Sequence, residues 1–205
     1  MDLLIDSVAG SDMFSFMDGF SGYNQIRRAP RDAEKTTFRT PIGNFYYTMM
    51  PFELKNVGAT YKRAMMAIFH DMMHQELEDY VNDIVLKSRR RKEHFHVLRK
   101  VFKRCRAFKL RMNPLKYSFR VSSGKFLGFQ VHSRGIDVDP TKAMAIATMR
   151  PLATIEELKS FLGKVSYIRR FIPRLASITS AFTKLLRKGQ SFKWGEAQQT
   201  AFKRL

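Results

Sequence analysis

The amino-acid sequence predicts an α+β fold, and two observations carry this prediction. Strand-like runs alternate with amphipathic helical patterns as far as residue 150, whereas only helical patterns follow Pro151. The chain has 205 residues, of which 44% are hydrophobic and 13% aromatic. A chain of this length and composition forms one or two compact units with a real core and is not a disordered basic tail.

The first predicted elements are strands. Residues 13–17 form a β-rich run between two glycine-containing segments, which places Asp18 at a strand end. Residues 36–40 and 45–50 predict two more strands, joined as a hairpin through the turn residues 41–44.

Two amphipathic helices and an intervening turn follow. Residues 58–75 and 95–112 carry apolar side chains at the spacing of a helix with one buried face. Between them, the β-rich run 80–86 is interrupted by Asn82 and Asp83, whose side chains favour tight turns. Strand, turn and strand are therefore predicted there.

A further strand and a capped helix complete this part of the chain. Residues 125–131 alternate as a single strand in which Gly128 marks a bulge or a close backbone approach. Asp139 followed by Pro140 predicts the N-cap and first residue of a helix that runs toward Met149.

The segment after Pro151 predicts a small helical subdomain. Thr154 and Glu157 have the spacing of a capping box that starts an amphipathic helix. A second amphipathic helix follows Pro173 and is predicted to end at Gly189, after which the chain begins another element.

The charge of the chain points to a polyanionic partner. The formal net charge is +19, which favours nucleic acid first and an anionic membrane surface second. No apolar run is long enough to cross a bilayer, and Asp2 and Asp6 occupy the place where a signal peptide carries basic residues. We therefore expect no membrane partner and an intracellular location, in the cytoplasm or nucleus. The single cysteine, Cys105, excludes an internal disulfide and a cysteine-based zinc site.

Acidic residues at a strand end and at a turn raise the possibility of metal-dependent chemistry. Nucleotidyl transfer needs carboxylates from separate elements that converge on two divalent cations about 4 Å apart. Asp18 and Asp83 fit this requirement by position. Solvated turn acids are the alternative, and the two residues alone do not decide between them.

Sequence blocks around these acids resemble, in order, those of reverse transcriptases, with the nearest resemblance to the gypsy-type LTR retrotransposons of plants. The blocks are residues 16–26, 50–52, 59–61, 80–83, 126–128 and 161–172, and residues 192–202 resemble the approach to the RNase H region. The resemblance covers essentially the whole chain. It implies a right-hand polymerase with partial fingers and palm (an antiparallel sheet flanked by helices) over 1–150, a helical thumb over 151–189 and the start of the connection to an RNase H-like domain over 190–205.

The resemblance also implies roles for individual residues. Asp18 matches the first metal-binding aspartate of the palm, and Asp83 matches the second acid of the Tyr-x-Asp-Asp turn, so both become ligands of two Mg²⁺ ions. Tyr23 matches the ring beneath the incoming sugar, where it would exclude a 2′-hydroxyl, and Phe52 matches a residue lining the nucleotide pocket. Tyr80 seats the catalytic turn. The primer-gripping hairpin is matched by Phe126, Leu127, Gly128 and Phe129.

The implied activity is that of an RNA-directed DNA polymerase. Its partners would be an RNA/DNA primer-template and deoxynucleoside triphosphates. The domain would originally have belonged to a larger polyprotein with RNase H and integrase.

Three departures from the family pattern predict that this copy is inactive or severely impaired. Asn82 replaces the first acid of the catalytic turn, and an amide offers an oxygen but no charge to Mg²⁺. Glu53 replaces a glycine and would place a carboxylate beside a triphosphate. The chain also begins after the expected position of the basic fingers strands. We therefore expect a truncated, degenerate domain, and the alternative function is a non-catalytic nucleic-acid-binding remnant or a domesticated module.

Two further motifs have competing interpretations. His70 and His74 have the spacing of a helical zinc motif, but no third ligand is evident, so an ordinary helix surface is the favoured interpretation. The basic run Arg89, Arg90, Arg91 and Lys92 predicts a nucleic-acid contact, with a localisation signal or a solvated helix start as alternatives.

Overall fold

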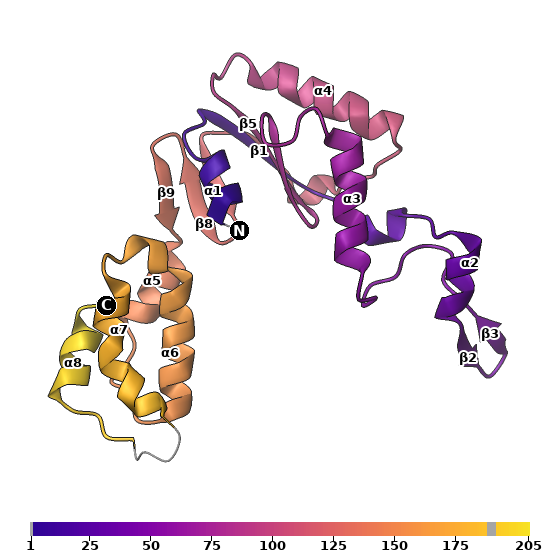
Figure 1. The fold of residues 1–205 in the computed structure, drawn as a ribbon. Helices are drawn as coiled ribbons and strands as arrows, with labels where there is room; N and C mark the ends of the chain where they lie inside the picture. The colour runs from indigo at the N-terminus through magenta and orange to yellow at the C-terminus, as the bar shows by residue number, and fades with distance from the viewer. Residues whose placement is uncertain (1, 188–191) are drawn as a thin grey trace. The chain divides into compact units, whose positions relative to one another are not determined.

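The computed structural model describes residues 2–187 and 192–205, which divide into two compact units, Met1–Ile136 and Asp137–Leu205 (Figure 1). The compositional change at Pro151 lies inside the second unit. Each unit has its own hydrophobic core.

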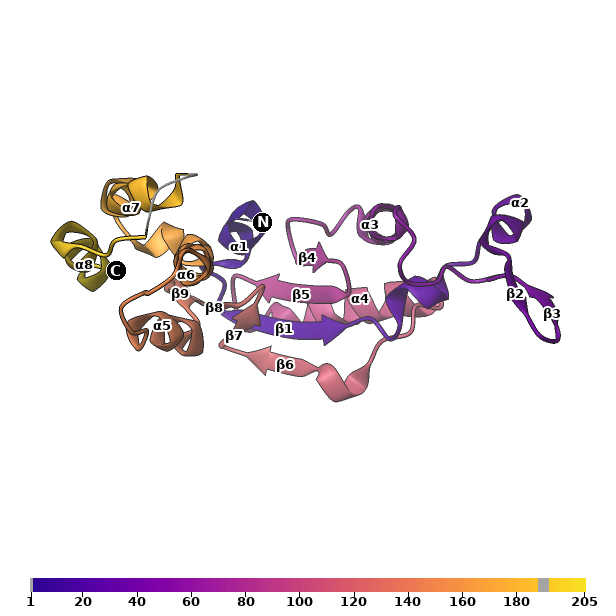
Figure 2. The ribbon, with the colours of Figure 1, turned by 90° about the horizontal axis from the view of Figure 1, so that it is seen from below.

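A four-stranded antiparallel sheet with strand order β4-β5-β1-β6 forms the centre of the first unit (Figure 2). Its strands are β1 (Met13–Asp18), β4 (Leu77–Tyr80), β5 (Asp83–Ser88) and β6 (Ser118–Val121). The predicted first strand and the predicted strand, turn and strand are confirmed. The sequence did not predict β6, because this edge strand is largely exposed and lacks the apolar alternation of a half-buried strand.

Two helices, α3 (Val57–Phe69) and α4 (His94–Ala107), cover one face of this sheet. Met17 and Ile84 point into the core that these helices close, together with Tyr61 and Val101. Because side chains alternate along a strand, Asp18 points to the opposite face from Met17. Both helices were predicted, but α3 ends at Phe69 and not at residue 75, and α4 ends at Ala107 and not at residue 112.

Smaller elements complete the first unit, and the last of them, β9, runs into the second. They are α1 (Asp2–Val8), α2 (Pro30–Ala33), the hairpin of β2 (Phe38–Thr40) with β3 (Gly43–Phe45), and a three-stranded sheet of β7 (Ser123–Phe126), β8 (Phe129–His132) and β9 (Gly135–Val138). Short 3₁₀ segments occur at Gly22–Gln25, Glu34–Thr36, Pro114–Lys116, Arg169–Phe171 and Lys184–Leu186.

Two of the predicted strands differ from those observed. The β2–β3 hairpin was predicted, but β3 stops at Phe45 because its residues are exposed and offer no face to a core. The single strand predicted over 125–131 is wrong. Leu127 and Gly128 have φ values of 50° and 81° and form a two-residue turn between β7 and β8, as type I′ hairpins require.

The described residues of the second unit form four α-helices: α5 (Pro140–Ala147), α6 (Ile155–Tyr167), α7 (Leu175–Thr183) and α8 (Glu196–Lys203). The side chain of Asp139 accepts a hydrogen bond from the Thr141 backbone amide at 3.0 Å, which confirms the predicted cap of α5. The predicted capping box is confirmed as well, since Thr154 accepts from the Glu157 amide at 3.1 Å and Glu157 accepts from the Thr154 amide at 3.3 Å. Gly189, the predicted end of the next helix, lies outside the described residues.

Candidate functional site

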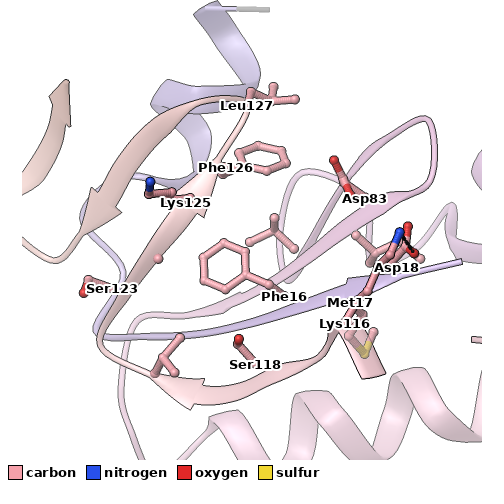
Figure 3. Close-up of a pocket in the computed structure, with 14 residues that line it drawn as sticks. Phe16, Met17, Asp18, Asp83, Lys116, Ser118, Ser123, Lys125, Phe126 and Leu127 are labelled. Atoms are coloured by element: carbon pink, nitrogen blue, oxygen red, sulfur yellow. Dashed lines mark ion pairs between the residues drawn. The ribbon is translucent and has the colours of Figure 1, made fainter. Parts of the chain in front are cut away.

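Asp18 and Asp83 lie side by side at one end of the central sheet. They are direct partners in the antiparallel register of β1 and β5, although they are far apart in the sequence. Both line a pocket of about 370 Å³ together with Lys116, Phe126 and Leu127 (Figure 3). The convergence that nucleotidyl transfer chemistry requires is therefore present in the backbone geometry.

The charges in this pocket are partly compensated. Lys116 Nζ lies 3.0 Å from Asp18 Oδ2, and the Asp18 side chain is only 15% exposed. Burial raises the pKa of Asp83, the negative charge of Asp18 raises it further, and Lys116 opposes both effects. The two carboxylates thus repel each other, and one ammonium group stabilises the pair. No sequence motif marked Lys116, because its role depends on the position of the Pro114–Lys116 turn beside β1.

Asn82 occupies the tight turn between β4 and β5, but its side chain is not among those that line the pocket. Asn82 Oδ1 is buried without a hydrogen-bond partner in the part of the chain that the structure describes. It faces Gly22, where an added Cβ would lie 2.5 Å from it and 2.8 Å from the Tyr61 hydroxyl. The turn is strained, since the β-branched Val81 has φ 60°.

Three aromatic rings gather beside the turn. Tyr23 packs edge-on against Phe52 and against Tyr61, with ring centroids 5.3 Å apart in both pairs. Burial raises the pKa of the Tyr61 hydroxyl, and this buried hydroxyl has no hydrogen-bond partner among the described residues. The sequence indicated Tyr23 and Phe52. Tyr61 lies within one of the matched sequence blocks, but no role was predicted for it.

Glu53, next to Phe52, is exposed and has φ 74°. This backbone conformation favours glycine, because a Cβ in the left-handed region clashes with the following carbonyl oxygen. The structure therefore gives a backbone reason why glycine suits this position.

The hairpin predicted to grip a primer borders the same pocket. Phe126 and Leu127 line it, whereas Phe129 is buried and lies outside the lining. Gly124 allows β7 to approach β1 closely, because a Cβ there would lie 2.2 Å from a Phe16 ring carbon.

The remaining candidate residues lie elsewhere. The basic run 89–92 is exposed between β5 and α4 and does not line this pocket. The two histidines do not share a helix face, because α3 ends before His70; His74 has φ 63° and its Nδ1 lies 2.8 Å from Glu78 Oε2. The described residues contain no group of three or more His, Cys, Asp or Glu side chains that fits a metal ion. Nor does any described helix have the length and apolar character needed to cross a membrane.

Comparison with known proteins identifies similar sequences. A family profile described as "Reverse transcriptase (RNA-dependent DNA polymerase)" matches residues 2–131. The chain is 27% identical over its whole length to the Transposon Tf2-3 polyprotein of Schizosaccharomyces pombe, and 34% identical over 88% of its length to the retrovirus-related Pol polyprotein from transposon opus of Drosophila melanogaster. It spans only 15% and 18% of the lengths of these two polyproteins.

Solved structures share the fold. The foamy viral protease-reverse transcriptase in complex with dsDNA matches with a TM-score of 0.86 at 20% identity, over 98% of this chain and 43% of that one. The same protein in complex with an RNA/DNA hybrid matches with a TM-score of 0.81 at 20% identity, over 97% of this chain and 27% of that one. The predicted palm-like α+β fold is confirmed.

Proposed function

This chain belongs to the reverse transcriptase family, and we propose that it is an RNA-directed DNA polymerase domain by descent whose present site supports little or no polymerisation. The family reaction joins a deoxynucleotide to the 3′ end of a primer on a template. The observation that carries the proposal is the composition of the pocket at the end of β1 and β5. It holds Asp18, Asp83 and Lys116, and the side chain of Asn82 lies outside it.

The donor set does not fit two Mg²⁺ ions. Magnesium is held by carboxylates in near-octahedral geometry, and this pocket offers two carboxylates, of which Asp18 is already bound to Lys116. The third carboxylate of the family pattern is replaced by Asn82, whose carbonyl oxygen is buried against Gly22. A pair of divalent cations would keep about one extra unit of positive charge relative to a site with three carboxylates.

This difference is large on the scale of catalysis. If the missing charge removes about 4 kcal/mol of transition-state stabilisation, the rate falls roughly a thousandfold. Glu53 adds to the loss, because an exposed carboxylate beside Phe52 repels a triphosphate at the proposed nucleotide pocket.

The other proposed roles follow the arrangement of the site. Tyr23 and Phe52 would bind the nucleotide sugar and base, Tyr80 would seat the turn, and the β7–β8 hairpin would hold the primer. Residues 151–189 would form the thumb, and residues 190–205 would begin the connection to an RNase H-like domain. The parent element would be of the gypsy type found in plants, with RNase H and integrase in the same polyprotein. Because deoxynucleoside triphosphates are found inside cells, an intracellular location is part of this proposal.

Primer extension tests the polymerase assignment. The parent chain, Asn82→Asp, Glu53→Gly and the double variant are assayed on poly(rA) and oligo(dT) with Mg²⁺ or Mn²⁺. We expect no detectable extension by the parent and measurable extension by the double variant, which Asp18→Asn then abolishes. Efficient extension by the parent would refute the impairment, and failure of the double variant would refute the role given to the two substituted positions.

A second candidate is nucleic-acid binding without chemistry, which the net charge of +19 favours. It requires retention of primer-template with an affinity that falls steeply as salt rises, because bound phosphates release counterions. Weak binding with a shallow salt dependence would count against it.

A further inference from the structure

A second hollow of about 670 Å³, the α4–β6 groove, lies between helix α4 and the edge strand β6. Phe95, Phe102 and Phe119 contribute aromatic surface to it. Phe95 is 60% exposed and Phe119 is 43% exposed, and Phe102 packs edge-on against Phe119 with centroids 5.9 Å apart. Exposed rings gathered in one hollow are typical of a binding surface.

The charged side chains that line the same groove are all cationic. They are Arg99, Lys103, Arg106 and Arg120. None of the four forms an ion pair within the described residues. The guanidinium of Arg99 lies 6.0 Å from the centroid of the Phe95 ring, so cation and ring surfaces adjoin.

Other cations of α4 are neutralised within the fold. Lys100 Nζ lies 2.7 Å from Glu76 Oε2, and Arg104 Nη2 lies 3.0 Å from Asp71 Oδ2. Residues 100 and 104 are one helical turn apart and share a face, whereas residues 99, 103 and 106 form the adjacent stripe. Acidic residues of the chain therefore compensate the cations on one face of α4, but not the cations on the groove face. The uncompensated positive charge makes the groove complementary to a polyanion.

The groove and the Asp18–Asp83 pocket lie on different sides of the central sheet. Ser15 of β1 contacts the α4 residue His94, with Ser15 Oγ 2.7 Å from His94 Nε2. Asp18 has the opposite orientation along the same strand, because successive side chains alternate. A ligand of the groove is therefore separate from a ligand of the pocket.

We propose that the α4–β6 groove binds single-stranded nucleic acid. Unpaired bases expose the flat faces that stack on exposed phenylalanine rings, while arginine side chains bind the phosphates. A duplex hides its base faces, and an acidic peptide uses the cations but has no equivalent planar groups for the rings. This assignment is independent of polymerase activity and stands or falls separately from it.

A local fluorescent probe tests the proposal. Phe95→Trp places an indole in the groove, and Phe108→Trp places one at an equally exposed position just beyond the end of α4, outside the groove lining. The sole native tryptophan, Trp194, lies in the second unit and supplies a constant background measured in the parent chain. Each protein is titrated with oligo(rU) and oligo(dT), and thermal unfolding confirms that both variants are folded.

We expect quenching at position 95 and none at position 108. Added Arg99→Ala and Lys103→Ala substitutions should lower the affinity at least tenfold and make the plot of log K against log salt shallower by about 1.4, since each single-strand phosphate contact contributes about 0.7. Phe95→Ala should lower the affinity by about tenfold through lost stacking, measured by anisotropy of a labelled oligonucleotide.

Four outcomes would overturn the assignment. Equal quenching at both positions would show non-specific binding, and no quenching at position 95 would remove the site. Displacement of the oligonucleotide by poly-glutamate at equal charge concentration would identify an acidic protein segment as the better ligand. A blue shift with anionic vesicles in the absence of oligonucleotide quenching would identify a membrane surface.

Discussion

Replacing Glu53 by glycine is expected to stabilise the first unit, even though it removes a whole side chain. Glu53 has φ 74° and is exposed, so the change relieves backbone strain and loses no buried contact. The left-handed conformation costs a non-glycine residue about 1–2 kcal/mol. Part of this gain, about 0.5–1 kcal/mol, is offset because glycine loses more conformational freedom on folding than other residues. The difference between the midpoints of these two ranges gives an expected net increase in the free energy of unfolding of about 0.75 kcal/mol.

Urea denaturation of the parent, Glu53→Gly and Glu53→Ala measures this difference. Alanine removes the carboxylate but keeps Cβ, so Glu53→Ala should remain within about 0.5 kcal/mol of the parent, as surface substitutions usually do. The glycine variant should unfold at higher urea with an unchanged m-value. If alanine stabilises as much as glycine, charge and not backbone conformation is responsible; if glycine destabilises, the strain argument is wrong.

Two further predictions concern the first unit. Burial lowers the pKa of His94, and the charge of Arg120 lowers it further, so the folded state binds this proton less readily than the unfolded chain and stability falls as pH drops below about 6.5. His94→Gln should flatten this dependence in urea melts between pH 5 and 8. The buried Asp79, whose pKa is raised to about 7, titrates in both the parent and the variant. If the difference in the free energy of unfolding between the two proteins stays constant over this pH range, the assignment to His94 is refuted. Gly124→Ala should destabilise the fold by about 1–3 kcal/mol, because the new Cβ would lie 2.2 Å from the Phe16 ring. Gly58→Ala is the control and should be tolerated, because a Cβ there meets no atom within 4 Å. Equal effects of the two substitutions in thermal melts would show that the close approach at Gly124 does not matter.

Much of the fold follows from local patterns in the sequence. The helical spacing of apolar residues located α3 and α4, and the Thr154–Glu157 capping box marked the start of α6. These features depend on residues within one or two helical turns of each other, so a short stretch of sequence is enough to predict them. The edge strand β6 was missed for the converse reason, because an exposed strand is specified by its partner β1 and not by its own periodicity.

The sequence indicated only some of the residues of the candidate site. The sequence indicated Asp18, Asp83 and Asn82 and the resemblance supplied their roles, but Lys116 and Gly124 carried no signal. Their importance depends on which distant side chains they meet. The φ value of Glu53 likewise depends on the path of the chain between Pro51 and α3.

The sequence by itself determined the α+β class, the order of most elements, the strong positive charge and the identity of the acids at a strand end and a turn. Only the tertiary structure decided that Asp18 and Asp83 are direct partners, that Asn82 Oδ1 is buried beside Gly22, and that the uncompensated cations of α4 share a groove with exposed rings. The physical reason is the range of the interactions. Periodicity and capping act over about four residues along the chain, whereas strand register, side-chain direction and charge compensation are settled when segments distant in sequence pack together.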